Sequence, residues 1–477
     1  MLLLLLIFLP LAAAIVAALL PSRAAAKTVA LVAAVAELGI TLACIDDRTA
    51  VSLPWIPSLG ISFAVGFVGL SSLLVLLTNA LLPLILLSAN RADYNSRFYA
   101  LVLLMQAALV GVFTAGDGFL FYVFWELALI PIYFICLGWG EDGRARITLK
   151  FFIYTMAGSL FMLLGLVYLY LHTATHTFAW DALIAAGHSL DASHQSLVFW
   201  AFFVAFAIKM PIFPFHTWQP DTYTNAPAQG TMLLAGVMLK MGIFGAMHWL
   251  IPAVPMAVAD WSPLVVILSV IGVVYASIIA LQQRDMKRLV AYSSIAHVGL
   301  IAAGVFATNA QAWNGAAVQM LAHGFNVVGL FYCIDLIERR TGTRNLDRLG
   351  GLATADPAFA TLFFVLVLGT IAMPLTNGFV GEFLLLMGLS HYSLWAAAFA
   401  ATTMILGAVY MLRLYRASMF GEVATANKGR RMATPVDVAI LLPLAMTVVI
   451  MGFFPAFFLH TAAPAVDQLL ALLAAHK

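Results

Sequence analysis

The chain has 477 residues, of which 64% are hydrophobic and only 9% are charged, with a formal net charge of +2. A soluble domain contains about 25% charged residues, and no soluble core can bury so large an apolar share. The composition therefore excludes a soluble globular protein and indicates a chain whose solvent is lipid. The small net charge and the lack of an extended basic run argue against nucleic acid as a partner.

The cysteines do not form a site. Cys44, Cys136 and Cys333 lie far apart, with no CxxC pair, which argues against zinc, an iron–sulfur cluster or a disulfide framework. We interpret them as small apolar packing residues. No glycine-rich nucleotide loop follows a predicted strand, so we expect no nucleotide or redox cofactor in this chain.

Long, continuously apolar runs predict an all-α polytopic membrane protein, because each membrane-spanning helix satisfies its own backbone hydrogen bonds. A β-barrel would show segments of about ten residues with alternating polarity, which these runs lack. Arg23 and Lys27 follow the first run instead of preceding it, so we interpret that run as a helix and not as a signal peptide. We expect about 14 spans, at residues 2–20, 28–44, 62–89, 97–115, 119–138, 149–171, 197–218, 229–250, 262–281, 291–307, 312–337, 359–389, 393–412 and 437–459.

The distribution of basic residues predicts the orientation of these spans. Of the 23 lysines and arginines, 19 fall in loops that follow odd-numbered spans. Loops after even-numbered spans carry only Arg48, and the C-terminal tail carries only Lys477. Because cytoplasmic loops are enriched in lysine and arginine, both termini are expected on the non-cytoplasmic side. The remaining two, Lys209 and Lys240, lie inside spans.

Several ionisable residues lie within the apolar spans, where a charge costs about 3 kcal/mol or more. They are Glu37, Glu126, Lys209, Lys240, His297, His323 and Glu382. Burial disfavours the charged form of a lysine and a nearby carboxylate favours it, so a Glu–Lys pair is a switchable proton site. The group therefore suits a proton relay better than a passive pore, which needs a polar lining throughout, or a metal transporter, which needs clustered ligands.

Each of these residues also has a purely structural interpretation. A lysine near a helix end reaches the interface with its long side chain, but Lys209 and Lys240 are placed near the middle of their spans. A glutamate can pair with a neighbour without any transport, and Glu37 has no evident partner in the N-terminal helices. A single membrane histidine is often only a hydrogen-bonding core residue. The functional argument therefore rests on the whole group.

Two predicted spans are interrupted beside an ionisable residue. Lys209 precedes Pro211 and Pro214, and in "MPLTNGFVGE" Pro374 comes shortly before Glu382. Proline removes a backbone donor and kinks a helix. Paired broken helices in corresponding positions are typical of inverted repeats around a transport site. We therefore expect two inverted five-helix repeats with discontinuous helices 7 and 12.

This scheme divides the chain into four segments. The N-terminal helices 1–3 occupy residues 1–92, the first repeat (helices 4–8) 93–255, the second repeat (helices 9–13) 256–420, and helix 14 with the tail 421–477. In this scheme the fifth span, which carries Glu126, corresponds to the tenth, which carries His297.

Six stretches together carry a family resemblance. They are "FYVFWELALIPIYF", "KFFIYTMAGSL", "FAIKMPIFPFHTWQPDTYTNAPAQGTMLLAGVMLKMGIFG", "DMKRLVAYSSIAHVGL", "LAHGFNVVGLFYC" and "NGFVGEFLLLMG". On these residues the chain resembles the antiporter-like, proton-translocating membrane subunits of NADH–quinone oxidoreductase (respiratory complex I), and among them the chain M family, the counterpart of mitochondrial subunit 4. The resemblance covers spans three to thirteen. One departure is "PDTYTNAP", where the family usually has "PDAHTEAP".

The resemblance implies roles in the first half of the chain. Glu126 looks like the glutamate of helix 5 that pairs with the lysine of helix 7, here Lys209. Lys240 looks like the lysine of helix 8 at the centre of the channel. His216 matches the histidine that follows the break in helix 7.

In the second half, His297 and His323 look like relay histidines and Glu382 looks like the acid of helix 12 in the outlet channel. Related subunits, including those of Mrp-type cation/proton antiporters, generally have lysine at the position of Glu382. An Mrp-type antiporter subunit and a membrane scaffold without transport are the alternative functions.

The resemblance also implies the setting of the chain. FMN, iron–sulfur clusters, NADH and quinone are expected in partner subunits, with no cofactor and no metal in this chain. The expected partners are other membrane-arm subunits of complex I, especially the two neighbouring antiporter-like subunits, and the lipid bilayer. The alanine-rich composition favours a bacterial cytoplasmic membrane.

Overall fold

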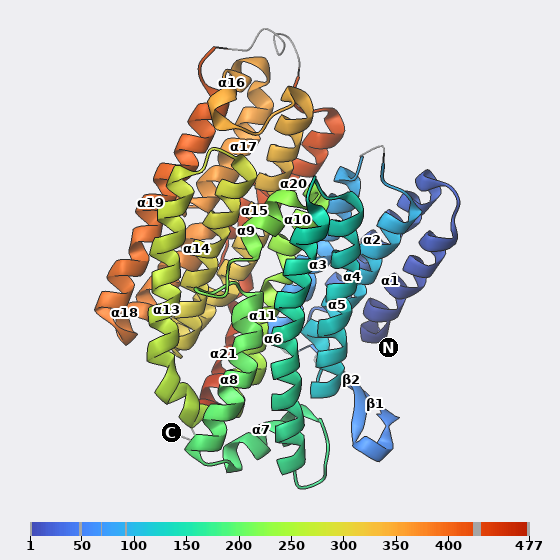
Figure 1. Ribbon diagram of the computed structural model, residues 1–477, viewed down its shortest axis with the longest axis vertical. Coiled ribbons are helices and arrows are strands. Elements are labelled where there is room, and N and C mark those ends of the chain that lie inside the picture. Colours follow the sequence, from blue (N-terminus) through green and yellow to red (C-terminus); the bar gives the residue numbers. More distant parts are fainter. Residues whose placement is uncertain (1, 47–49, 68, 91–92, 423–430, 475–477) are drawn as a thin grey trace. The chain divides into compact units, whose positions relative to one another are not determined.

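The computed structural model describes residues 2–46, 50–67, 69–90, 93–422 and 431–474, and they are mainly helical, as expected (Figure 1). Within these residues, 14 helices are long and apolar enough to cross a membrane. Five basic residues used in the orientation argument lie outside them: Arg48, Arg91, Lys428, Arg430 and Lys477. Contacts divide the chain into two compact units: unit 1 comprises 1–210, 237–265 and 461–477, and unit 2 comprises 211–236 and 266–460.

Several long helices of unit 1 are capped at their N-termini by polar side chains. Asn95 accepts a hydrogen bond from the backbone N–H of Phe98, and Asp191 accepts one from the backbone N–H of His194. Its elements are α1 (Leu2–Leu19), α2 (Arg23–Cys44), β1 (Val51–Ile56), η1 (Pro57–Leu59), β2 (Ile61–Val65), α3 (Gly69–Ser88), α4 (Ser96–Thr114), α5 (Gly118–Trp139), α6 (Arg144–His172), α7 (Trp180–Ser189), α8 (Ala192–Lys209), α11 (Lys240–Gly245), η3 (Ala246–Leu250) and α12 (Ile251–Ala253).

Unit 2 is also helical, and its α20 starts with a capping box between Thr434 and Asp437. Its elements are α9 (Gln219–Asn225), α10 (Ala228–Leu233), α14 (Met286–Phe306), α15 (Ala310–Thr341), η4 (Leu346–Arg348), α16 (Leu352–Ala355), α17 (Pro357–Thr370), α18 (Asn377–Tyr392), α19 (Leu394–Met419) and α20 (Pro435–Phe453). Three helices contribute to both units: η2 (Leu234–Met238), α13 (Pro255–Gln282) and α21 (Ala456–Ala474).

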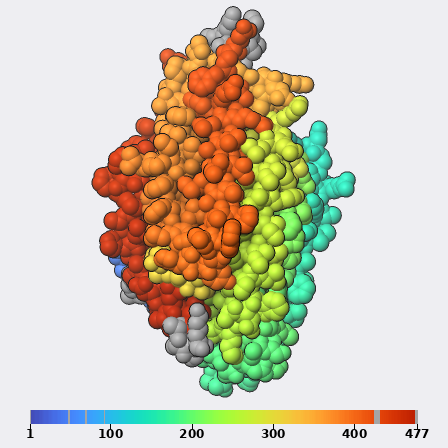
Figure 2. All heavy atoms as spheres, turned by 90° about the vertical axis from the view of Figure 1, so that its left-hand side faces the viewer, coloured from blue at the N-terminus to red at the C-terminus, as the bar shows by residue number. Residues whose placement is uncertain are grey.

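The outer face of unit 2 is apolar. Figure 2 shows α19, in orange, running along this face beside the yellow-green α13. Leu394, Trp395 and Ile405 of α19 are 74%, 77% and 68% exposed. Side chains of this kind face lipid or a partner subunit, because a soluble surface seldom carries so large an apolar patch.

Both predicted helix breaks are present. Helix α8 ends at Lys209, and a turn separates it from α9. Helix α17 ends at Thr370, and six residues separate it from the start of α18. In that second break Ala372 and Leu375 adopt φ angles of 54° and 70°, a left-handed conformation that is rare for residues other than glycine.

The structure corrects the sequence-based boundaries in three places. The predicted span 62–89 starts later, at α3, because its first residues form the antiparallel hairpin β1–β2. The predicted span 359–389 is two shorter helices, as its discontinuity implied. The predicted last span, 437–459, crosses a break at Phe454–Pro455 between α20 and a further long helix, α21, that was not expected. The four-segment division stays a prediction.

Candidate functional site

The first group of ionisable residues lies in unit 1. Lys209 occupies the last turn of α8 and is only 3% exposed. Glu126, on α5, is near enough to attract its ammonium group electrostatically. The described residues contain no direct ion pair within 4.0 Å between the two, so a modest side-chain movement can strengthen or weaken their attraction.

Aromatic and hydroxyl groups complete the surroundings of this pair. The ammonium group of Lys209 lies 5.1 Å from the ring centroid of Trp125, the residue before Glu126, which is a cation–π contact. One turn earlier on α5, the hydroxyl of Tyr122 lies beside the carboxylate of Glu126 and the hydroxyl of Ser159. A cation–π contact with Trp125 therefore stabilises the ammonium group of Lys209, while Tyr122 is a polar neighbour of the Glu126 carboxylate.

Lys240 lies on the next helix, fully buried at the first position of α11. Close backbone contact holds α11 against α8: a Cβ added at Gly242 would lie 2.8 Å from the carbonyl oxygen of Phe206, and one at Gly245 would overlap the Phe206 ring. Only glycine permits such an approach. The segments η2 and η3, which flank α11, are π-helical turns, a distortion common at functional sites.

The second group lies in unit 2, where α14, α15 and α18 meet. Nδ1 of His297 is 2.8 Å from Oε1 of Glu382, and both side chains are buried. The amide of Gln319 donates a hydrogen bond of 3.2 Å to the same carboxylate oxygen. The other oxygen, Oε2, has no hydrogen-bond partner among the described residues. An acid, a base and a neutral donor thus converge in an enclosed place.

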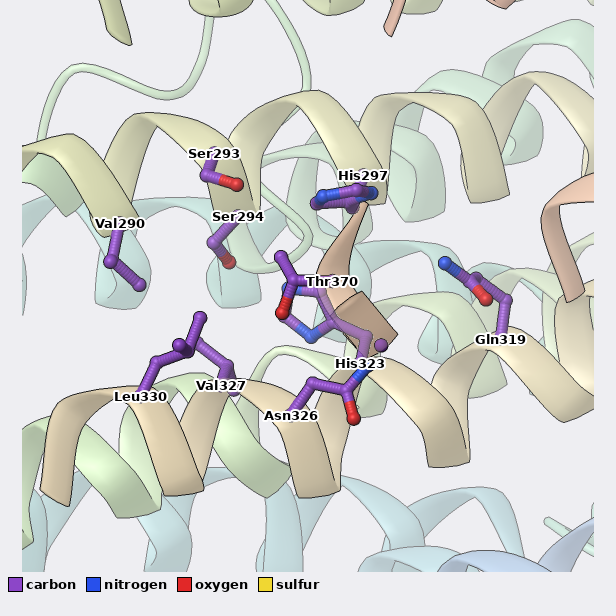
Figure 3. Close-up of a pocket in the computed structure, with 11 residues that line it drawn as sticks. Val290, Ser293, Ser294, His297, Gln319, His323, Asn326, Val327, Leu330 and Thr370 are labelled. Atoms are coloured by element: carbon purple, nitrogen blue, oxygen red, sulfur yellow. The ribbon is translucent and has the colours of Figure 1, made fainter. Parts of the chain in front are cut away.

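A small cavity adjoins this group (Figure 3). His297 and His323 both border it, with ring centroids 6.1 Å apart. Its volume of about 20 Å³ is sufficient for about one water molecule. Ser293 and Asn326 also line it, and the hydroxyl of Ser293 is 3.0 Å from that of the buried Tyr410 on α19. A bound water here would have several polar partners.

Two asparagines fix the break between α17 and α18. Asn326 of α15 and Asn377, the first residue of α18, exchange hydrogen bonds of 3.1 and 3.0 Å through their side-chain amides. Asn377 Oδ1 also accepts a bond of 2.8 Å from the backbone N–H of Gly378. This arrangement holds the start of α18, and with it Glu382 about one and a half turns later, against α15.

The structure brings most of the predicted residues into these two groups, but not all. His216 packs against Phe213 and Tyr275, with ring centroids 5.7 and 5.3 Å away, in the segment after the first break. Glu37 is fully buried on α2, and neither of its oxygens has a hydrogen-bond partner among the described residues.

Sequence reasoning missed the neutral members of the site. Trp125, Gln319 and Asn326 carry no charge, so they were not conspicuous in apolar runs. A helical spacing could have found Gln319, because it precedes His323 by four residues and therefore shares its helix face. Within the described residues, no three histidine, cysteine, aspartate or glutamate side chains cluster as metal ligands would.

The architecture defines the class: a polytopic membrane protein with discontinuous helices and buried ionisable groups beside the breaks, as in secondary transporters. A family described as "NADH:quinone oxidoreductase/Mrp antiporter, TM" matches residues 115–407. The chain is 37% identical to NADH-quinone oxidoreductase subunit M of Rickettsia typhi over 87% of its length and 84% of the relative's. It is also 37% identical to subunit M of Rhodobacter capsulatus, over 97% and 95% of the two chains.

Among solved structures, the chain is similar to a chain of respiratory complex I from Thermus thermophilus with bound NADH. The TM-score is 0.92 at 31% sequence identity, and the match covers 99% of this chain and 100% of that one. The chain belongs to the NADH-quinone oxidoreductase subunit M family.

Proposed function

We propose that this chain is a proton-translocating membrane-arm subunit of NADH–quinone oxidoreductase and that buried acid–base groups in its two units carry the proton. The observation that carries the proposal is the buried approach of His297 to Glu382, whose Nδ1 and Oε1 atoms are 2.8 Å apart, an ion-pair distance that does not have the geometry of a hydrogen bond. Family membership and the fold support the same function.

In the first unit, the attraction between Glu126 and Lys209 is the switch. When the carboxylate approaches, the ammonium form of Lys209 is favoured, and when it withdraws, the lysine releases its proton because burial disfavours a lone charge. The Trp125 ring stabilises the ammonium group of Lys209 even when the carboxylate has withdrawn, so the lysine does not lose all of its stabilisation at once. Lys240, on the adjacent α11, is the next acceptor in the proposal.

In the second unit, the proton is proposed to pass through His297 or His323 to Glu382. The cavity between the two histidines can hold water, which is needed because their rings are too far apart for direct transfer. Gln319 keeps the carboxylate oriented whether or not it is protonated, since its amide donates to Oε1. We assign His216 a supporting role near the first break, where its ring is held by aromatic neighbours.

The chain acts within a multi-subunit membrane complex. We propose that FMN, the iron–sulfur clusters, NADH and quinone bind to other subunits and that the two neighbouring antiporter-like subunits are the direct partners. In this scheme the chain contributes to an oxidoreductase reaction without a redox centre of its own. Electron transfer elsewhere would act on Glu126 through a neighbouring subunit.

The chain is a multi-pass membrane protein. We propose a bacterial cytoplasmic membrane with both termini on the non-cytoplasmic side, on the strength of the basic residues in loops after odd-numbered spans. Helix α21 would then lie at that side without crossing. In support, Gln468 of α21 borders the same cavity as Ser52 of the hairpin, which belongs to a non-cytoplasmic loop in this scheme.

An Mrp-type cation/proton antiporter subunit is the second candidate, because the family description includes it. The relatives named above are subunit M proteins, and the acid at Glu382 differs from the lysine generally found in Mrp-type subunits. Sodium/proton exchange by the purified complex in the absence of NADH would favour the antiporter.

The test uses inverted membrane vesicles that contain the assembled complex, in which NADH oxidation and proton uptake are followed together. Lys209→Ala and Lys240→Ala should each lower the number of protons taken up per NADH, while Lys150→Ala, at an exposed position on α6, should not. Native gels show whether each variant assembles. An unchanged proton yield in both assembled variants would reject the relay and favour a scaffold.

A further inference from the structure

Unit 1 contains a large cavity that is separate from the acid–base groups described above. Its volume is about 350 Å³, which is enough for on the order of ten water molecules. The walls come from the hairpin, α3, α4, α7, α11, η3 and α21. Its polar lining residues are Ser52, Thr114, Trp180, Asp181, His248 and Gln468.

His248 is the lining residue that points to a function. Its ring stacks on Phe244, at 5.1 Å and 19°, and on Trp180, at 5.2 Å and 15°. Trp180 is itself anchored, because its Nε1–H donates a bond of 2.9 Å to the backbone oxygen of His248. The His248 ring is buried and borders the cavity. Since buried polar groups are normally satisfied, water in the cavity is the natural partner of this imidazole.

The same helix connects His248 to Lys240. Lys240, Phe244 and His248 follow one another at intervals of four residues, so their side chains lie along one face, and the stacking of Phe244 on His248 shows this directly. At 1.5 Å per residue, Lys240 and His248 are about 12 Å apart along the helix axis. Phe244 lies between them, borders the cavity, and packs edge-on against Phe113 at 5.5 Å.

We propose that His248 is a proton-binding site that exchanges protons between Lys240 and the water of this cavity, with Phe244 as a dry gate between them. The inference rests on the proposed function, since it needs Lys240 to carry a proton. In the forward step an N–H bond of the Lys240 ammonium breaks, water carries the proton past Phe244, and an N–H bond forms on the imidazole. The imidazolium then gives a proton to cavity water and becomes neutral again.

The chemistry of the surroundings supports this assignment over simple aromatic packing. Histidine changes its charge near neutral pH, which suits a site that binds and releases protons. The titratable groups among the described lining residues are His248 and Asp181, and the carboxylate of Asp181 can stabilise an imidazolium at the cavity. The nearby Asp117 is engaged by the backbone N–H groups of Ser62, Phe119 and Leu120. An apolar ring such as Phe244 interrupts water and so prevents a free leak.

The orientation proposed above places the cavity at the non-cytoplasmic end of unit 1, because the loop containing the hairpin follows an even-numbered span. His248 would thus give the first half of the chain an outlet of its own, in addition to the one at Glu382. Protons would leave from both units, and not from unit 2 alone.

The test compares His248→Phe, which keeps the aromatic stack but cannot bind a proton, with Lys240→Ala in vesicles containing the assembled complex. The proposal predicts that protons taken up per NADH fall in His248→Phe to the level of Lys240→Ala. His194→Phe, at an exposed histidine on α8, is the matched control. If His248→Phe does not assemble, His248→Gln serves in its place.

A second measurement uses no NADH. Proton flow through the complex is driven by a potassium diffusion potential, and Phe244→Ala should raise it several-fold because the gate is removed. Adding His248→Phe should return the flow to the wild-type level. A normal proton yield in His248→Phe, with a reduced yield in Lys240→Ala, would overturn the role of His248 and leave the proposed function standing. Normal yields in both would reject the proposed function itself.

Discussion

Glu382 and His297 form a buried pair in which Oε1 and Nδ1 are 2.8 Å apart and the side chains are 1% and 5% exposed. The two residues are 85 positions apart in sequence and come from α18 and α14. Their approach depends on the break before α18, since a continuous helix from Pro357 would present a different face at residue 382. The break and the acid–base pair are therefore one structural feature.

Glu382→Gln should lower the number of protons taken up per NADH by the share that leaves through unit 2. The amide has the shape of the carboxyl group, so packing is retained, but it cannot bind and release a proton. Glu382→Asp is the informative companion, because it keeps the titratable group at a slightly greater distance from His297 and should retain part of the uptake. The measurement is proton uptake per NADH in inverted vesicles, and wild-type uptake in Glu382→Gln would contradict the assignment.

Gly378→Ala should destabilise unit 2. A Cβ at Gly378 would lie 2.0 Å from the backbone oxygen of Gly369, on the other side of the break, and neither atom belongs to a flexible side chain. Overpacking of this kind costs about 1–3 kcal/mol or more. The thermal midpoint for release of the subunit from the purified complex should therefore fall by several degrees.

Gly407→Ala is the matched control in the same unit. Its nearest atom would be the Tyr410 hydroxyl at 3.5 Å, an ordinary contact, and alanine favours the helix by about 1 kcal/mol over glycine. Its thermal midpoint should be unchanged or slightly higher. Equal losses in the two variants would mean that the break tolerates a side chain at residue 378.

The sequence was sufficient to predict the helical membrane fold, the two breaks and most charged residues of the site. Apolar runs are read directly from composition, and Pro211 and Pro374 mark where a helix cannot continue. Charges in such runs are conspicuous because lipid makes them costly. These features are local, so they need no knowledge of which helices meet.

The missed features depend on tertiary context. The hairpin β1–β2 contains Pro54 and borders an apolar run, so its last strand was assigned to a helix. The pairing of His297 with Glu382 joins distant segments and cannot be deduced from spacing. The π-helical turns around Lys240 arise from packing, because nothing in the local sequence separates them from an α-helix.

Asp117→Asn should cost unit 1 less stability at neutral pH than Asp117→Ala does. Asp117 caps α5, the helix that carries Glu126, by accepting bonds from the N–H groups of Phe119 and Leu120, and its second oxygen accepts from Ser62 of β2. Asparagine keeps the cap of α5 through its Oδ1 atom, but its NH2 group cannot accept the hydrogen bond from Ser62 N–H. Burial raises the pKa of Asp117, although the backbone N–H groups lower it, so the charged form carries a desolvation cost that asparagine avoids.

The sign of the pH dependence follows from that raised pKa. The folded protein binds the Asp117 proton more tightly than the unfolded chain, so wild-type stability rises as pH falls through the folded pKa toward the ordinary pKa of 3.8. The stability of Asp117→Asn relative to the wild type should therefore fall over this range. Asp117→Ala should lose about 1–2 kcal/mol at neutral pH through the missing cap. Thermal midpoints at several pH values test both statements. They would be contradicted if Asp117→Asn lost as much stability as Asp117→Ala.

Asn326 and Asn377 should show energetic coupling in a double-mutant cycle. Each amide both donates to and accepts from the other, and both are buried, so removing one leaves the other with unsatisfied groups. Asn326→Ala and Asn377→Ala should each cost about 1–3 kcal/mol. The double variant should cost less than the sum, with a coupling of about 1–2 kcal/mol, because the second removal abandons no further partner. Thermal midpoints give the stabilities of the variants. Proton uptake should also fall in them, because the start of α18 is no longer held against α15. If the stability losses of the two single variants add up to that of the double variant, the two amides act independently.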